Sequence, residues 1–150
     1  MYSRGAVFFD DNFRYLNTPG ETGEKILILI NTPKSDDHLI LVKTTSQQHS
    51  KPQLPGCIDS HHKIFYMPVG SDILSKNTWI QLDDHFLFQQ QHAAKVFKHL
   101  GNLKPKTIKN IVDCFLLHNE DDLSPIIKNM ILPPVSQGIQ ALAAKFNNKR

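Results

Sequence analysis

One short segment concentrates side chains of the kinds that bind phosphate. Lys43, Thr44, Thr45 and Ser46 follow one another directly after an apolar run at residues 39–42. Hydroxyl groups can hold phosphate oxygens, and an ammonium group can stabilise negative charge that develops on them during a reaction. This predicts a phosphate site at Thr44, Thr45 and Ser46, with Lys43 supplying charge. A structural interpretation stays open, because threonine favours strands and lysine protects sheet edges from pairing.

Two adjacent histidines are candidates for proton transfer. His61 and His62 lie in a polar stretch beside Asp59 and Ser60. The pKa of an unperturbed histidine is about 6.5, so it can act as a general acid or base in phosphodiester cleavage near neutral pH. The alternative is a pair of solvent-exposed loop histidines without a chemical role.

A third cluster, Asp83, Asp84 and His85, follows an alternating segment at residues 78–82. Two carboxylates and an imidazole can bind a divalent metal or orient a base, which would indicate a metal-dependent hydrolase. We favour a different role, in which Asp84 caps the N-terminus of a following helix.

Five lysines in the second half of the chain either form a phosphate-binding face or belong to solvated helix surfaces. Acidic residues at 113 and 120–122 favour the second interpretation. The five are Lys95, Lys98, Lys104, Lys106 and Lys109. Glycine-rich phosphate loops, GxSxG, HExxH and CxxC motifs are absent from the sequence.

The elements that must position these residues begin with a hairpin. The apolar runs at residues 26–30 and 39–42 are rich in β-branched side chains and too short for independent helices, so they predict two buried strands. Residues 31–38 between them are mostly polar turn formers and include Pro33. We therefore expect an antiparallel hairpin whose second strand ends in the Lys43–Ser46 cluster.

Other strands are expected at residues 6–9, 64–69 and 78–82, and helices at 93–100, 108–116, 124–131 and 135–146. Ser124 followed by Pro125 is typical of an N-cap and the first helical position. Strands followed by helices predict an α+β fold with a small antiparallel sheet or barrel. We expect one domain over residues 1–150, with a β-barrel part at 1–88 and a helical part at 89–150.

The composition is that of an ordinary globular chain of 150 residues with a net charge of +3, which permits a nucleic-acid partner without requiring one. We expect no membrane span and no signal peptide, because long apolar runs are absent. Cys57 and Cys114 are far apart in sequence and match no metal or redox spacing. We therefore expect reduced, structural thiols and a cytoplasmic location.

The hairpin and its flanking strands resemble the MazF/PemK (Kid-like) toxin superfamily over roughly residues 5–85. The resemblance is carried by AVFFD at 6–10, KILIL at 25–29, LILVKTTSQ at 39–47, FYMP at 65–68 and TWIQLD at 78–83, in that order. It implies an SH3-like barrel with appended helices. It also implies a toxin of a bacterial toxin–antitoxin system, with an antitoxin protein as partner.

Ribonucleases of this superfamily cut single-stranded RNA without a metal or other cofactor, by assisting attack of the ribose 2′-hydroxyl on the adjacent phosphate. The resemblance places Thr44, Thr45 and Ser46 where the family has its catalytic hydroxyl. Lys25-Ile26 stands where the family has Arg-Pro. A lysine keeps the charge but loses the planar, bidentate grip of arginine on phosphate. Lys25 and Lys43 are thus the expected substrate-binding cations.

One alternative to catalysis and one assembly state complete the expectations. Some toxins of this fold inhibit a protein target such as DNA gyrase and cut nothing, so a non-catalytic binding module is the principal alternative. The apolar stripe of the helix at 135–146 predicts an interface, and Kid-like toxins are commonly dimers. We therefore expect a homodimer.

Overall fold

The computed structural model describes residues 2–14, 22–48, 50–58 and 63–132. Seven antiparallel strands form one sheet in the order β4-β5-β6-β3-β2-β1-β7. The strands are β1 (Ala6–Arg14), β2 (Thr22–Leu29), β3 (Leu39–Thr45), β4 (Gly56–Ile58), β5 (Ile64–Met67), β6 (Thr78–Phe88) and β7 (Lys98–Asn102). The helices are α1 (Gln90–Val96), α2 (Pro105–Asn119) and α3 (Pro125–Ile131). The predicted α+β class is confirmed.

The predicted central hairpin is confirmed. β2 pairs with β3 over Leu27–Lys43, Ile28–Val42 and Leu29–Leu41. Asn31 is fully buried at the start of the connecting loop, where its Oδ1 accepts the Ile40 N–H at 2.9 Å and its Nδ2 donates to the His38 carbonyl at 3.1 Å. One side chain therefore satisfies buried backbone groups that the turn leaves without ladder partners.

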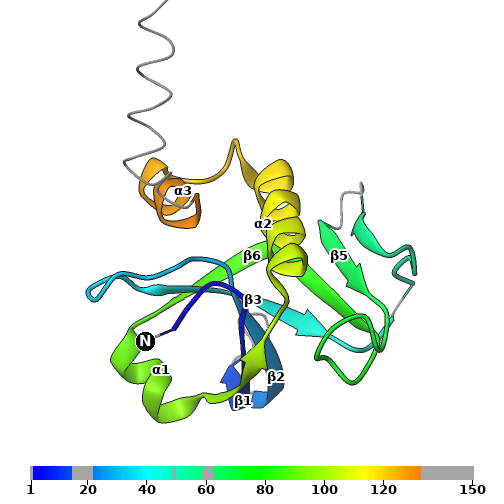
Figure 1. The fold of residues 1–150 in the computed structure, drawn as a ribbon, viewed down its shortest axis with the longest axis horizontal. Helices are drawn as coiled ribbons and strands as arrows, with labels where there is room; N and C mark the ends of the chain where they lie inside the picture. Colours follow the sequence, from blue (N-terminus) through cyan, green and yellow to red (C-terminus); the bar gives the residue numbers. More distant parts are fainter. Residues whose placement is uncertain (1, 15–21, 49, 59–62, 133–150) are drawn as a thin grey trace, which may run out of the picture.

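The two faces of the sheet carry separate apolar clusters, because successive strand residues point in opposite directions. On one face, Ile28, Val42 and Ile80 pack beneath α2, whose buried residues include Ile111 and Phe115. Figure 1 shows α2 lying across the sheet, with α3 beyond it. The helix predicted at 108–116 is confirmed as part of α2.

On the other face, Leu27, Leu29, Leu39 and Leu41 pack with Phe8 and with α1. Phe97, the last residue before β7, lies 5.0 Å from Phe88 and 5.7 Å from Phe8 between ring centroids. Side chains around α1, and not a further ladder, cover this side of the core.

The sheet is not closed into a barrel, which corrects the barrel expected from the sequence. Its edges are β4 and β7, and no ladder joins them within the described ranges. Among the described residues, the first half of β6 pairs with both β5 and β3, while its second half pairs with β3 alone. To close a barrel, the chain would have to continue as a strand after β6, but it forms α1 there.

The helix expected at 93–100 is only partly correct. α1 ends at Val96, and Lys98–Asn102 forms β7, which pairs with β1. Gly101, the residue after the expected helix, lies opposite Val7 in this strand with φ +149. A Cβ there would meet the Ile73 side chain at 3.1 Å, so glycine suits both the conformation and the space.

The start of α3 follows the sequence prediction. Ser124 is the N-cap, and its hydroxyl accepts the Ile127 N–H at 3.2 Å, with Pro125 in the first turn. The helix predicted at 135–146 lies outside the described residues. No helix in the described part of the chain is long and apolar enough to cross a membrane.

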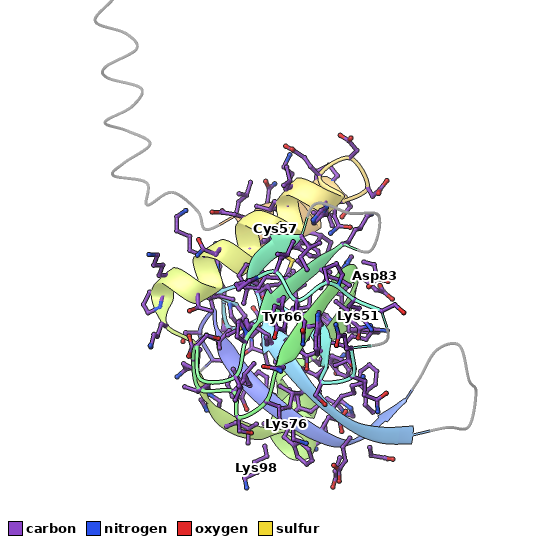
Figure 2. All side chains as sticks on the ribbon, turned by 90° about the vertical axis from the view of Figure 1, so that its right-hand side faces the viewer. Lys51, Cys57, Tyr66, Lys76, Asp83 and Lys98 are labelled. Carbon is purple, nitrogen blue, oxygen red and sulfur yellow. A yellow bond between two sulfur atoms is a disulfide. The ribbon has the colours of Figure 1, made fainter. Side chains whose placement is uncertain are left out.

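The expectation of two separate reduced thiols is wrong. Cys57 on β4 and Cys114 on α2 form a disulfide with a Cα–Cα distance of 5.6 Å. Figure 2 shows Cys57 beneath α2, the helix that covers this end of the sheet. Packing of α2 over β4 and β5 brings the two cysteines together, although 57 positions separate them in the sequence. The cytoplasmic location was predicted from two reduced cysteines, and the disulfide removes that reason. The location stays a prediction.

Candidate functional site

The candidate site lies where β2 and β3 separate. Their ladder stops at the pair Leu27–Lys43. Beyond this pair, β2 stays paired with β1, while β3 stays paired with β6 as far as Thr45–Trp79. β2 thus continues beside β1 and β3 continues beside β6, so a gap opens between β2 and β3 beyond their last paired residues.

Side chains bridge this gap in place of ladder bonds. The Lys25 ammonium donates to the Thr44 carbonyl at 3.1 Å, and the Thr44 hydroxyl donates to the Ile26 carbonyl at 2.9 Å. Thr44 is buried, so its hydroxyl has a structural role in joining the strands.

A cavity of about 420 Å³ occupies the gap. It collects four residues that the sequence analysis selected, Lys25, Thr44, Thr45 and Ser46. Its other lining residues are Phe9, Glu24, Ile26, Gln47, Leu74, Ser75, Lys76 and Thr78. The lining therefore combines hydroxyls, ammonium groups and one carboxylate.

The hydroxyls of Thr45 and Ser46 are better placed to bind a ligand than the hydroxyl of Thr44. Thr45 accepts the Gln47 N–H at 3.1 Å, which occupies a lone pair of its oxygen and leaves the hydroxyl proton able to donate. Ser46 lies at the exposed end of the strand. Thr45 and Ser46 can therefore donate to an anion in the cavity.

The electrostatic environment of Lys25 favours an anion. Burial lowers the pKa of the Lys25 ammonium, and the positive charges of Lys43 and Lys51 lower it further. Lys51 donates to the carbonyls of Gln47 and Gln48 at 3.3 and 3.2 Å, which holds the loop after β3 beside the site. A bound phosphate would reduce this repulsion between like charges.

The same loop is anchored from the sheet. The indole N–H of Trp79 donates to the Pro52 carbonyl at 2.8 Å, and the Trp79 ring stacks on Tyr66 with centroids 4.8 Å apart. The predicted alternation of this strand is confirmed, because Ile80 and Leu82 lie in the cluster under α2 while Trp79 packs on the opposite face.

Lys43 is not part of the cavity lining, although the sequence analysis placed it in the site. It lies opposite Leu27 in the last pair of the β2–β3 ladder, before the two strands separate around the cavity. Its contribution to the site is the positive charge that acts on Lys25.

His61 and His62 lie outside the described residues. Asp83, Asp84 and His85 belong to β6, so the predicted role of Asp84 as a helix cap is wrong. The Asp84 carboxylate accepts the N–H of His85 at 2.8 Å, and the His85 ring packs 5.9 Å from Phe115. The three do not form a metal-binding group in the described part of the chain.

The five lysines of the second half lie on different elements. Lys109 forms an ion pair of 2.9 Å with Asp113 one turn later, as expected for a solvated helix face. Lys95 belongs to α1, Lys98 to β7, Lys104 precedes α2, and Lys106 and Lys109 lie on α2.

Glu24, Ser75 and Lys76 were missed by the sequence analysis. Ser75 and Lys76 precede β6, and Figure 2 shows Lys76 at the end of the molecule away from Cys57. Antiparallel pairing places the start of β6 beside the end of β3. Pairing of the segment 39–45 with the segment 78–88 would have indicated Ser75 and Lys76 as site residues. Local sequence patterns do not specify such strand pairing.

The sequence matches no protein-family model, and it matches no curated protein. The function of the chain is accordingly argued from the residues of the cavity.

Proposed function

We propose that the cavity between β2 and β3 binds a phosphodiester of single-stranded RNA and promotes its cleavage without a metal ion. The supporting observation is that Lys25 from β2, Thr45 at the end of β3 and Ser46 directly after it line one cavity. Lys76 is contributed by the loop before β6. Donors on several walls can hold the phosphate from several directions.

The reaction is transesterification. The ribose 2′-oxygen attacks phosphorus, the bond to the 5′-oxygen breaks, and the products are a 2′,3′-cyclic phosphate and a 5′-hydroxyl. Lys25 and Lys76 stabilise the charge on the non-bridging oxygens, and Thr45 and Ser46 donate hydrogen bonds to them. Glu24 is the carboxylate in the described lining and is the proposed base for the 2′-hydroxyl. His61 or His62, predicted from the sequence as a general acid or base, is the proposed acid that protonates the leaving oxygen.

This proposal is consistent with the MazF/PemK resemblance in the position of its hydroxyls after the third strand. It differs in the cation, because Lys25 replaces the family arginine and cannot grip phosphate in two places. Lys76 provides a second ammonium group in compensation.

Cleavage is tested with purified, oxidised full-length protein and long, end-labelled single-stranded RNA in EDTA. We expect fragments ending in 2′,3′-cyclic phosphate. Thr45→Ala should slow cleavage by about a hundredfold, whereas Thr45→Ser keeps the hydroxyl and should retain activity. Thr32→Ala is the matched control, because Thr32 is an exposed threonine in the hairpin loop. Intact RNA with the wild-type protein would exclude catalysis.

A non-catalytic module that binds a protein target is the second candidate function. It is favoured by the missing arginine and by two large apolar side chains in water, Leu117 on α2 and Ile126 on α3, which are 70% and 73% exposed. This function predicts uncut RNA together with a stoichiometric protein complex that Leu117→Ser or Ile126→Ser weakens. If the wild-type protein both cuts RNA and captures a protein, loss of cleavage in Thr45→Ala with unchanged capture would show that the two activities use different residues.

The sequence also supports proposals about the partner, the location and the oligomeric state of the chain. The chain acts as the toxin of a toxin–antitoxin pair in the cytoplasm and forms a homodimer, with the segment at 135–146 near the interface. Light scattering at tens of micromolar protein tests the dimer, and a monomer mass contradicts it. A dimer that survives deletion of residues 134–150 would assign the interface elsewhere.

A further inference from the structure

A cluster of metal-binding atom types lies away from the cavity, between α2 and the sheet edge. Cys57 Sγ, Cys114 Sγ and a ring nitrogen of His118 all lie within 4.8 Å of one another. The two sulfurs are joined as a disulfide, and His118 Nε2 lies 3.5 Å from Cys57 Sγ. The proposed RNA chemistry uses none of these three groups.

The fold holds the three side chains in place from two rigid elements. Cys114 and His118 are four residues apart on α2, so they share one face of the helix. Cys57 comes from β4, whose neighbour β5 supplies the Ile64 carbonyl that lies 3.9 Å from Cys114 Sγ. Cys114 is 2% exposed, whereas Cys57 faces solvent.

The spacing of the histidine and cysteine fits a tetrahedral metal site. Zinc binds thiolate sulfur at about 2.3 Å and imidazole nitrogen at about 2.0–2.1 Å, so a tetrahedral angle separates the two ligands by about 3.5 Å. The observed separation of Cys57 Sγ and His118 Nε2 is 3.5 Å. When the disulfide is broken, a modest rotation of the cysteine side chains would bring the sulfurs to the spacing of two zinc ligands.

A cavity beside the two cysteines, which His118 does not line, can admit a fourth ligand. A cavity of about 310 Å³ is lined by Cys57 and Cys114 together with Asp113 and Leu117. Water can enter there and complete the coordination. Asp113 lies in the same lining, but its carboxylate is paired with Lys109 at 2.9 Å.

We propose that, once the disulfide is reduced, Cys57, Cys114 and His118 bind one thiophilic divalent cation of the zinc class. A dithiol reductant donates two electrons and two protons to the Cys57–Cys114 disulfide. The reductant becomes a disulfide itself, and the protein is left with two thiols. Metal binding then releases both thiol protons and uses the neutral imidazole. The disulfide holds β4 against α2 in oxidising conditions, and the metal holds the same elements together in reducing conditions.

The test uses the full-length chain and Co²⁺ as a spectroscopic probe. A phosphine reductant opens the disulfide without adding a competing thiol. We expect one Co²⁺ per chain, with thiolate-to-metal charge-transfer absorption and the strong visible bands of tetrahedral cobalt. Zn²⁺ should displace the cobalt and abolish both signals. The oxidised chain should give neither.

Variants identify the ligands. Cys57→Ser, at an exposed position, should remove most of the charge-transfer absorption, and His118→Asn should weaken binding by at least about tenfold. His92→Asn is the control, because His92 is an exposed histidine on α1. Circular dichroism confirms that each reduced variant remains folded.

The proposal is overturned if the reduced, folded wild-type chain shows no charge-transfer absorption. It is also overturned if His118→Asn binds Co²⁺ as tightly as the wild type, or if the oxidised chain binds equally well. Because the RNA experiment uses oxidised protein in EDTA, its result does not depend on this site.

Discussion

The ammonium group of Lys25 on β2 donates a hydrogen bond to the main-chain carbonyl of Thr44 on β3, at 3.1 Å. This contact spans the point where the ladder between the two strands has ended. It fixes a cation beside the hydroxyls of Thr45 and Ser46 and so organises the cavity. Lys25 is therefore the residue whose replacement is most informative.

Replacing Lys25 should change RNA binding in a salt-dependent manner. Each phosphate contact on a single strand contributes about 0.7 to the slope of log affinity against log salt, so Lys25→Gln should lower the magnitude of the slope by about that amount. Lys25→Arg should keep the slope and increase affinity, because guanidinium binds phosphate through two donors. Fluorescence anisotropy across a salt series measures both. Lys98→Gln on β7 is the control, and an equal change there would indicate non-specific charge effects.

The pKa of Lys25 should rise when an anion binds. Burial and the charges of Lys43 and Lys51 lower this pKa in the free protein, so a phosphate that offsets those charges moves it back toward the ordinary lysine value. Affinity for the phosphate should then fall as alkaline pH deprotonates Lys25. NMR titration of the lysine side-chain signals, with and without a short oligonucleotide, measures the shift. An unchanged Lys25 titration in the complex would show that the phosphate binds elsewhere.

Asp72 should stabilise the N-terminus of α2. Its carboxylate accepts the Lys104 N–H at 3.1 Å, although the N-cap residue Lys104 has no capping side-chain bond of its own. Asp72→Ala should lower the free energy of unfolding by about 1 kcal/mol. Urea denaturation measures this loss, with Asp36→Ala as a control at an exposed loop aspartate.

The contribution of Asp72 should also depend on pH. Burial raises the pKa of the Asp72 carboxyl, but hydrogen bonds from Thr107, Lys104 and Ile73 and the charge of Lys104 outweigh it, so the pKa is lowered overall. A carboxyl with a lowered folded pKa stabilises the fold above its ordinary pKa, and this stabilisation disappears as pH falls through the folded value. The difference between wild type and Asp72→Ala should therefore shrink in acid. A constant difference down to the lowest pH at which the protein folds would contradict this.

Reducing the Cys57–Cys114 disulfide should destabilise the chain. The bond joins residues 57 positions apart, and a cross-link of that span restricts the unfolded chain, which typically contributes about 2–4 kcal/mol. Thermal unfolding with and without a phosphine reductant, in EDTA, measures the effect. Zn²⁺ added to the reduced protein should restore part of the loss. Equal melting temperatures for oxidised and reduced protein would show that packing of α2 alone holds β4.

The sequence by itself determined the features that depend on local patterns. Alternating and β-branched residues predict the central hairpin and place Thr44, Thr45 and Ser46 at a strand end, and Ser124-Pro125 predicts the start of α3. These features depend on periodicity and capping over a few residues. Such signals are present in the chain before it folds.

The tertiary structure decided what depends on contacts between distant segments. The separation of β2 from β3 creates the cavity, and the pairing of β3 with β6 brings Lys76 into it. Packing of α2 on the sheet joins Cys57 to Cys114. Pairing with β1 makes residues 98–102 a strand, although helical spacing predicted that the preceding helix continues to residue 100. Sheet register and packing between distant segments are set by the global arrangement of the chain, so no local pattern encodes them.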